Sequence, residues 1–430
     1  MKILIIGPFP PRKAAEADHT FYLSQHLADR GLDVHVLTVK GSISPKHPSV
    51  RIHPIMKDWS WSDFTRLART IRRCSPDAVL LVYTRGVYDG HPMITFSPTV
   101  CKKLLPQVLF VTLFEDAPSI PAAAATQSSL IRRAVRSGVA LGRTLMRRPP
   151  IVVSAVRTGM ALWAGRENLD YKYGTLLRDS DRLIVVSERA RAGLAARFAG
   201  VDDKSVVIPT PPLLRMCPEN NGVTRKRFRE LLDIKPADFL LAYFGYIYPG
   251  KGVETLFKAF RVLSAQRGNV RLIMVGGDIN LRNISVYLRE IHMMPKEMGI
   301  DDKIKWTGGY AWDSDEASCY LRAADICVLP FDSGVSLHNS SFAAAAAHGL
   351  PVITTRGEIL EQPFIHQKNV FLCPPKNPEA MALAMATLID NPEIRQDHRL
   401  GALELAREWY SWDTATERTI ATFDGRLPKR

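Results

Sequence analysis

The feature that most constrains this chain is the alternation of short apolar runs with segments of helical periodicity. Residues 3–6 form one such run, residues 21–28 carry apolar side chains at helical spacing, and residues 34–37 form the next run. This order predicts a β-α-β beginning, because two parallel strands need a helical crossover between them. Further strands are predicted at 78–83, 108–113, 183–187, 239–244, 270–275, 304–306, 326–329 and 351–354, and helices at 188–198 and 253–265. The fold class is therefore α/β, with parallel sheets covered by helices.

The pattern begins a second time after a break. The sequence Val-Val-Ile-Pro-Thr-Pro-Pro at 206–212 cannot continue a regular element, and the next apolar strand starts at Phe239. A length of 430 residues also fits two domains. We predict a first domain at 1–208, a second at 209–400, and a terminal helix within 401–430 that returns to the first domain. Two doubly wound halves would leave a cleft faced by the carboxyl ends of their strands.

Composition excludes several classes of protein. No apolar run reaches the roughly 18 residues that a membrane-spanning helix needs, and the first apolar run stops at Pro8, too early for a signal-peptide core. The six cysteines are scattered singly, which argues against a disulfide scaffold and a structural zinc site. We therefore expect a cytoplasmic protein.

The net charge of +14 favours an anionic partner, and much of it lies in one segment. Residues 121–166 hold no acidic side chain, while apolar residues recur there at helical spacing. The arginines that flank this apolar face are Arg132, Arg133, Arg136, Arg143, Arg147 and Arg148. The pattern is typical of a helix on an anionic membrane surface and equally of a core-facing helix with a solvated basic side. Nucleic acid is disfavoured, because aromatic side chains are not interleaved with the arginines.

Short motifs of the sequence argue against a nucleotide-binding loop of the nicotinamide or Walker type and against a metal site. A nicotinamide-binding loop needs glycines, whereas Gly7 is followed by Pro8, Pro10 and Pro11, and no Walker lysine motif occurs. Asp313-Ser-Asp315 has the form that some sugar transferases use to hold a divalent ion, and so does Asp179-Ser-Asp181. A pattern that occurs twice in unrelated places is weak, and we predict no metal and no cofactor.

An ordered series of motifs resembles the GT-B fold glycosyltransferases, in particular the retaining family 4 (group 1). Residues 1–11, 28–38 and 178–187 look like the first half of that family. The second half is represented by Phe244-Gly-Tyr-Ile-Tyr-Pro-Gly-Lys-Gly252 and by segments at 271–277, 306–309, 324–330, 348–353, 369–375 and 410–412. The resemblance covers nearly all of the chain except about residues 116–175. It implies two Rossmann-like domains, of which the first binds the acceptor and the second a nucleotide sugar, most commonly a UDP- or GDP-sugar.

The resemblance also implies a donor site. Lys251 stands where the family keeps a phosphate-binding lysine, although a surface turn lysine would look the same in the sequence. Tyr246 replaces an arginine that is common in the family. The residues we expect at the donor site are Gly245, Tyr246, Lys251, Gly252, Gly309, Tyr310, Ser333, Gly334, Val335, Ser336, His338, Asn339 and Ser340.

The sharpest departure from the family lies between Phe331 and Gly349. Members commonly carry two glutamates separated by seven residues, and those positions fall on Ser336 and Ala344 here. We interpret the segment as a variant diphosphate clamp in which Ser340 or Ser341 caps an alanine-rich helix and leaves N–H groups for an anion. The alternative is a capped helix start that has lost its donor role.

Candidate catalytic residues lie in the first half. Glu16 and His19 are one turn apart on the first helix, and Glu115 and Asp116 follow the strand at 108–113, where many relatives have a histidine instead of Phe114. Carboxylates at the carboxyl end of a strand could activate an acceptor hydroxyl or stabilise an oxocarbenium ion. They could equally form a solvated loop pair.

The sequence thus predicts a retaining, metal-independent hexosyltransferase that moves a sugar from a nucleotide sugar to an acceptor hydroxyl, in surface polysaccharide, glycolipid or lipid-linked glycan assembly. Its expected partners are a nucleotide sugar, a glycan or lipid-linked acceptor and an anionic membrane surface, with peripheral association at the inner face of the membrane. One alternative is a catalytically inactive GT-B scaffold or binding protein, favoured by Ser336, Ala344 and Phe114. A phosphorylase-type GT-B enzyme is the third.

Overall fold

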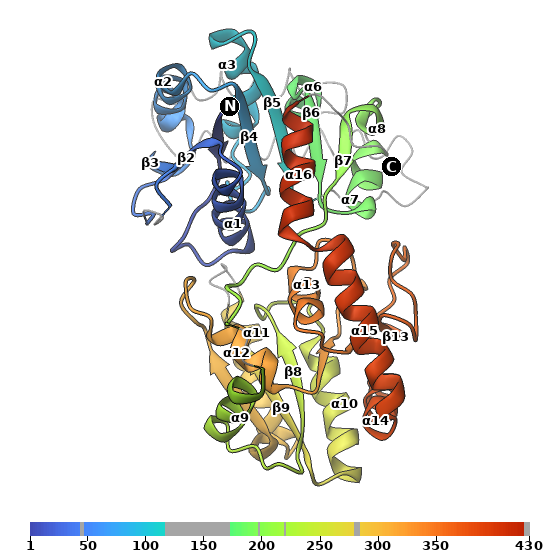
Figure 1. The fold of residues 1–430 in the computed structure, drawn as a ribbon. Helices are drawn as coiled ribbons and strands as arrows, with labels where there is room; N and C mark the ends of the chain where they lie inside the picture. Colours follow the sequence, from blue (N-terminus) through green and yellow to red (C-terminus); the bar gives the residue numbers. More distant parts are fainter. Residues whose placement is uncertain (44–46, 117–172, 197, 219–220, 279–283, 425–430) are drawn as a thin grey trace. The chain divides into compact units, whose positions relative to one another are not determined.

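The computed structural model describes residues 1–43, 47–116, 173–196, 198–218, 221–278 and 284–424. The chain divides into two compact units. Unit 1 is Met1–Pro209 together with the residues from Ala415 on, and unit 2 is Thr210–Thr414. In each unit helices flank a parallel sheet (Figure 1).

Unit 1 is built on a seven-stranded sheet in the order β3-β2-β1-β4-β5-β6-β7. Every strand pair in it is parallel. The strands are β1 (Lys2–Ile6), β2 (Asp33–Val39), β3 (Val50–Met56), β4 (Ala78–Tyr83), β5 (Leu109–Phe114), β6 (Arg182–Val185) and β7 (Ser205–Val207). All six residues of β4 are buried, as expected for a central strand covered on both faces.

The helices of unit 1 lie mainly between consecutive strands in the sequence. They are α1 (Ala15–Asp29), η1 (Trp61–Asp63), α2 (Phe64–Cys74), η2 (Ile94–Phe96), α3 (Ser97–Leu104), α6 (Gly174–Asp179), α7 (Glu188–Ala195) and α8 (Val201–Lys204). The last helix of the chain, α16 (Trp412–Phe423), continues into this unit, where Arg30 pairs with Glu417 at 3.1 Å. Helix α1 buries Leu23 and Leu27 against the sheet core, which places its first turn beside the strand ends.

Unit 2 is built on a six-stranded parallel sheet in the order β10-β9-β8-β11-β12-β13. The strands are β8 (Phe239–Phe244), β9 (Val270–Val275), β10 (Ile304–Gly308), β11 (Ile326–Leu329), β12 (Val352–Thr355) and β13 (Phe371–Cys373). The helices are α9 (Asn221–Leu231), α10 (Val253–Gln266), α11 (Ser285–Glu297), η3 (Asp301–Lys303), α12 (Glu316–Ala323), α13 (Ser340–Ala347), α14 (Pro378–Asp390) and α15 (Pro392–Trp409).

Both sheets reverse their strand order at one point. In unit 1 the reversal lies between β1 and β4, and in unit 2 between β8 and β11. Ligands of such sheets bind beyond the carboxyl ends of the strands at this reversal, where the loops separate to opposite faces. In unit 2 we therefore expect a ligand site at the loops after β8 and β11.

Two helices lie near the end of the chain. Helix α15 runs to Trp409 within unit 2, and α16 continues into unit 1, within the range 401–430 where the sequence predicts a terminal helix that returns to the first domain. The indole of Trp412 donates a hydrogen bond to Pro212 O at 3.0 Å, which ties the start of α16 to the first residues of unit 2.

Candidate functional site

The loop after β8 is shaped by glycines that no other residue could replace without a shift of the backbone. Gly252, at the start of α10, has φ +71°, and a Cβ added there would lie 1.9 Å from Pro330 O. Gly245 has φ +132°. Asp332 N donates a hydrogen bond to Gly250 O at 3.0 Å. The loop after β8 thus packs directly on the end of β11, at the point where the sheet reverses its order.

Lys251 occupies this loop with its ammonium group over two aromatic rings. Its Nζ lies 4.9 Å from the centre of the Tyr248 ring and 5.0 Å from that of Phe331. In the described part of the chain Lys251 forms no ion pair with a carboxylate. The two rings hold the cation in place and leave its charge for an anionic ligand.

The segment after β11 is fixed by main-chain and side-chain hydrogen bonds. Val335 N donates to Thr355 O at 2.9 Å, and Leu337 N donates to the buried carboxylate of Glu361 at 2.8 Å. A Cβ at Gly334 would lie 2.1 Å from Gly357 N. Sequence reasoning missed Glu361, because the segment that carries it lies some 24 residues beyond the loop that it fixes.

Helix α13 begins differently from the prediction. Its N-cap is Asn339, so Ser340 and Ser341 are the first helical residues and neither of them is the cap. The Asn339 carboxamide accepts from Ser336 N at 2.7 Å and makes no cap hydrogen bond to the helix. A Cβ at Gly245 would lie 3.7 Å from Ser341 Cβ, so this helix start adjoins the glycine loop. Amides at such a helix start are suited to binding an anion.

Ser336 lies inside this loop rather than on its surface. It is 2% exposed, and its hydroxyl has no hydrogen-bond partner among the described residues. Ala344 is completely buried on α13. Neither position could hold a solvated glutamate without rearrangement.

The remaining donor residues of the prediction lie at the carboxyl ends of neighbouring strands. Gly309 follows β10, and its N would lie 2.8 Å from a Cβ at Gly277 in the loop after β9. The Tyr310 ring stacks on Phe244 with centres 6.4 Å apart. The backbone of Tyr246 accepts from the Tyr243 hydroxyl at 3.1 Å. His338 O accepts from Ser340 N at 3.0 Å.

A second group of polar residues gathers at the strand ends of unit 1. The Nδ1 atom of His19 on α1 is hydrogen-bonded to a carboxylate oxygen of Glu115, which follows β5. The side chain of His19 is 7% exposed and that of Glu115 is 11% exposed. Burial raises the pKa of Glu16, and the nearby charge of Glu115 adds to this effect. The structure therefore brings together three residues that the sequence predicted as catalytic.

Asp116 faces a different set of partners. Arg85 N donates to one of its carboxylate oxygens at 3.2 Å, and the Tyr173 hydroxyl donates to the other at 3.3 Å. Burial raises the pKa of Asp116. Sequence reasoning missed Arg85 and Tyr173, although Arg85 could have been found as the second residue after the strand at 78–83.

The basic segment lies outside the described residues, whereas the aspartates of the two Asp-x-Asp motifs are described with their contacts. The basic segment 121–166, with the arginines predicted to contact a membrane or an acceptor (Arg132, Arg133, Arg136, Arg143, Arg147 and Arg148), is not among the described residues. Asp179 accepts from Arg178 at 2.7 Å and Asp181 accepts from Lys102 at 2.6 Å. Asp315 is the N-cap of α12, and Asp313 O accepts from Arg215.

None of the helices that the structure describes is long and apolar enough to span a membrane.

The fold identifies a class of protein. The structure of Anabaena HepE in complex with UDP matches with a TM-score of 0.69 and 14% identity, over 99% of this chain and 100% of that one. Sucrose-phosphate synthase from Thermosynechococcus elongatus matches with a TM-score of 0.66 and 17% identity, over 99% and 98% of the two chains. Two Rossmann-like units with these sheet orders define the GT-B fold.

Two parts of the sequence match known glycosyltransferase families. Residues 238–391 match the family described as glycosyl transferases group 1, and residues 13–111 match glycosyl transferase 4-like proteins. Over these residues the chain is similar to group 1, GT4-like glycosyltransferases.

Curated glycosyltransferases are similar to part of the chain. The D-inositol 3-phosphate glycosyltransferase of Corynebacterium efficiens is 28% identical over 59% of this chain and 61% of the relative. The GDP-mannose-dependent alpha-(1-6)-phosphatidylinositol monomannoside mannosyltransferase of Mycobacterium tuberculosis is 24% identical over 55% of this chain and 59% of the relative. The chain thus spans about three fifths of the length of these relatives.

Proposed function

We propose that this protein is a glycosyltransferase that moves a sugar from a nucleotide sugar to an acceptor hydroxyl. The observation that carries the proposal is the arrangement in unit 2, where Lys251 and the start of α13 meet at the glycine loop after β8. A leaving nucleoside diphosphate gains negative charge as the bond to the sugar breaks. A fixed ammonium group and the amides of a helix start stabilise that charge without reorganisation.

Unit 1 would bind the acceptor through the polar group around His19. Its hydrogen bond with Glu115 orients the ring, and an imidazole nitrogen is a group that can accept a proton from a hydroxyl group. Glu16 and Asp116 have raised pKa values, so each can hold a proton more readily than an exposed carboxylate and donate a hydrogen bond to a sugar oxygen.

The finer assignment rests on the family resemblance and on the relatives. We propose transfer with retention of the anomeric configuration, without a metal, from a UDP- or GDP-sugar. HepE binds UDP, and the mycobacterial relative is named for GDP-mannose, so both bases are represented among similar proteins. Both curated relatives act on inositol-containing acceptors by name, which supports glycolipid or surface polysaccharide assembly at a membrane from the cytoplasmic side.

The experiment is a turnover assay with UDP- and GDP-sugars in the presence of EDTA. Release of the nucleoside diphosphate should depend on an added acceptor such as inositol phosphate or phosphatidylinositol, and NMR of the product should show the anomeric configuration of the donor. An inverted product would refute retention, and activity that EDTA abolishes would refute metal independence.

The burial of Ser336 and Ala344 favours one alternative function, a binding protein without turnover. Such a protein would bind the nucleotide through Lys251 but release no diphosphate from any donor and acceptor pair. Nucleotide binding without turnover would therefore select this alternative.

A further inference from the structure

A second polar cavity lies in unit 2, away from the glycine loop. Its volume is about 420 Å³, and it lies between α9, the end of α12, the turn after α13 and the start of α15. We call it the arginine pocket, and its charged and titratable lining residues are Arg225, Arg322, Asp325, His348, Arg395 and Arg399.

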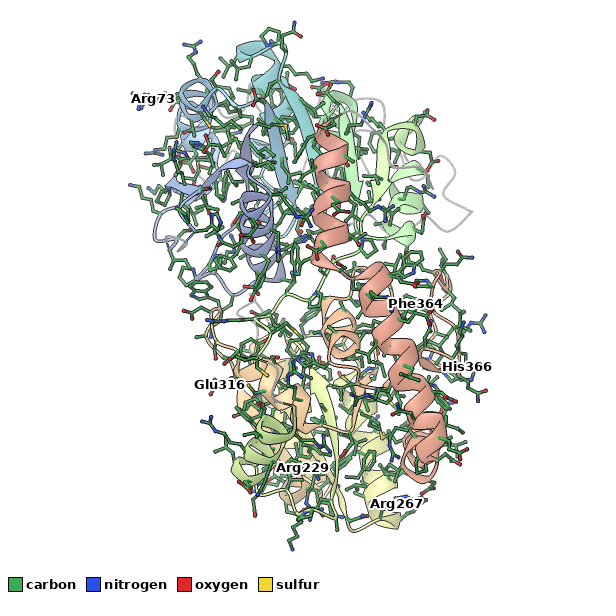
Figure 2. The ribbon with its side chains drawn as sticks, in the orientation of Figure 1. Arg73, Arg229, Arg267, Glu316, Phe364 and His366 are labelled. Atoms are coloured by element: carbon green, nitrogen blue, oxygen red, sulfur yellow. The ribbon has the colours of Figure 1, made fainter. Side chains whose placement is uncertain are left out.

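The arginine pocket opens at the opposite edge of the sheet from the glycine loop. Asp325 directly precedes β11 and Pro351 directly precedes β12, so both mark the amino ends of the strands. Arg229, on α9, lies at this edge (Figure 2). Strands of four residues separate the two edges by roughly 13 Å. A ligand in the arginine pocket would therefore leave the donor site free.

The charge of the arginine pocket is strongly positive. Four arginines line it, and Asp325 is the sole carboxylate among the described lining residues. That carboxylate is already engaged, because it pairs with Arg225 at 2.5 Å and Arg229 at 3.3 Å and accepts from Leu240 N at 2.7 Å. The charges of Arg395 and Arg399 thus have no compensating acid among the described residues of the cavity wall.

Two of these arginines are held in place by the protein. Arg395 donates through Nη1 to Leu388 O at 2.6 Å, and its guanidinium carbon lies 5.3 Å from the centre of the Phe239 ring. Arg322 donates through Nη2 to Cys217 O at 3.4 Å. Arg399 follows Arg395 by one helical turn on α15 and is exposed. A preorganised guanidinium group loses little entropy when it binds an anion.

His348 forms a neutral part of the wall. Its ring bonds to Ala344 O and to the Ser318 hydroxyl, each at 2.7 Å. Burial lowers the pKa of His348 to about 4, so the ring is uncharged at neutral pH. The positive charge of the arginine pocket therefore comes from arginines, whose planar groups bind phosphoryl oxygens in pairs.

We propose that the arginine pocket binds the phosphoryl group of a small phosphorylated molecule, at a site separate from the donor site. The volume lies within the range of about 300–1,000 Å³ that is typical of small-molecule sites. The phosphoryl group can come from a soluble metabolite or from a phospholipid headgroup, and the recognition chemistry is the same for both.

Isothermal titration with inorganic pyrophosphate tests the proposal, performed on Lys251→Ala so that the donor site does not contribute. Arg399→Glu, added to that background, should weaken binding at least about 10-fold, because it removes one positive charge and adds a negative one. Gln396→Glu, on the same wall, should weaken it as well. The matched control is Arg407→Glu, an exposed arginine on the same helix outside the lining. Equal affinities in Arg399→Glu and Arg407→Glu, or no binding of millimolar pyrophosphate, would overturn the proposal.

Co-sedimentation with phosphatidylcholine vesicles, with and without phosphatidic acid, identifies the source of the phosphoryl group. Loss of vesicle binding in Arg399→Glu but not in Arg407→Glu, with competition by pyrophosphate, would assign the site to a lipid headgroup. Equal vesicle binding in both variants, together with the Arg399-dependent titration, would assign it to a soluble molecule. Because Arg399 is exposed and far from Lys251, the nucleotide response of unit 2 should be unchanged in Arg399→Glu. Failure of this proposal is therefore distinguishable from failure of the proposed function.

Discussion

The imidazole of His19 on α1 is hydrogen-bonded to the carboxylate of Glu115 after β5, across 96 residues of sequence. The two elements meet because α1 packs on the sheet with its first turn at the carboxyl ends of the strands. The contact joins a ring that can take up a proton to a carboxylate that stabilises the charged ring.

Removal of either partner should therefore lower turnover. We expect His19→Ala and Glu115→Gln each to reduce kcat by about 10²- to 10⁴-fold, the usual contribution of a general base and its orienting group. Nucleotide binding in unit 2 should be unchanged, which steady-state kinetics and a binding titration together would show. His26→Ala, in the last turn of the same helix, is the control and should retain activity. Wild-type kcat in His19→Ala would exclude the ring from the reaction.

Gly252→Ala should destabilise the loop after β8. The added Cβ would collide with Pro330 O, and φ +71° is strained for alanine. We expect the free energy of unfolding to fall by about 2 kcal/mol or more in urea titrations, with loss of nucleotide binding. Gly268→Ala, where a Cβ would meet nothing within 4 Å, is the matched control. Equal stability of the two variants would mean that the loop does not need its glycine.

Ala344→Glu restores a family glutamate at a position that is fully buried here. The larger, charged side chain should lower the free energy of unfolding by about 3 kcal/mol or more, through overpacking and burial of an unpaired carboxylate. Ala347→Glu, at the half-buried last residue of α13, should cost less than about 1 kcal/mol. A stable Ala344→Glu variant with increased turnover would show that the site still accepts the glutamate of the family.

Asp18 should make stability decrease as pH rises. Burial raises its pKa from 3.8 to about 8, and the charge of Glu16 adds to the effect. The folded state then holds a proton that the unfolded state has lost between these two values, so the free energy of unfolding falls across that window. Relative to wild type, Asp18→Asn should gain stability as pH rises from about 4 to about 8, by up to about 1.4 kcal/mol per pH unit. Thermal unfolding across this range measures the difference, with Asp29→Asn at the exposed helix end as control. A difference that does not change with pH would contradict the assignment.

The central strands could be predicted from the sequence because each is a continuous buried apolar run. The predicted bounds of β4, β8, β9 and β11 are confirmed to the residue. The prediction missed β3, an edge strand that contains Pro54 and is buried only at its two end residues, and it missed β7 and β13, which have three residues each.

The site could be predicted only in part. The glycines and Lys251 could be predicted from the resemblance. The position of Asn339 as the N-cap of α13, with its side chain hydrogen-bonded to Ser336 N and not to the helix, could not be predicted from a serine-rich sequence. The arginine pocket draws on Arg225, Arg322 and Arg395, which lie far apart in the sequence and come together only through the order of the strands. No local pattern could have indicated it.

Thermal stabilisation by nucleotides tests the central claim most directly. Wild type, Lys251→Ala and Lys258→Ala would be heated with UDP, GDP and ADP and with their sugar conjugates, Lys258 being an exposed lysine on α10. A ligand at 100 times its dissociation constant stabilises the folded state by about 2.7 kcal/mol. We predict that UDP or GDP stabilises wild type and Lys258→Ala, and that Lys251→Ala loses the response. The absence of a response in wild type, or an unchanged response in Lys251→Ala, would contradict a nucleotide-sugar site at this loop.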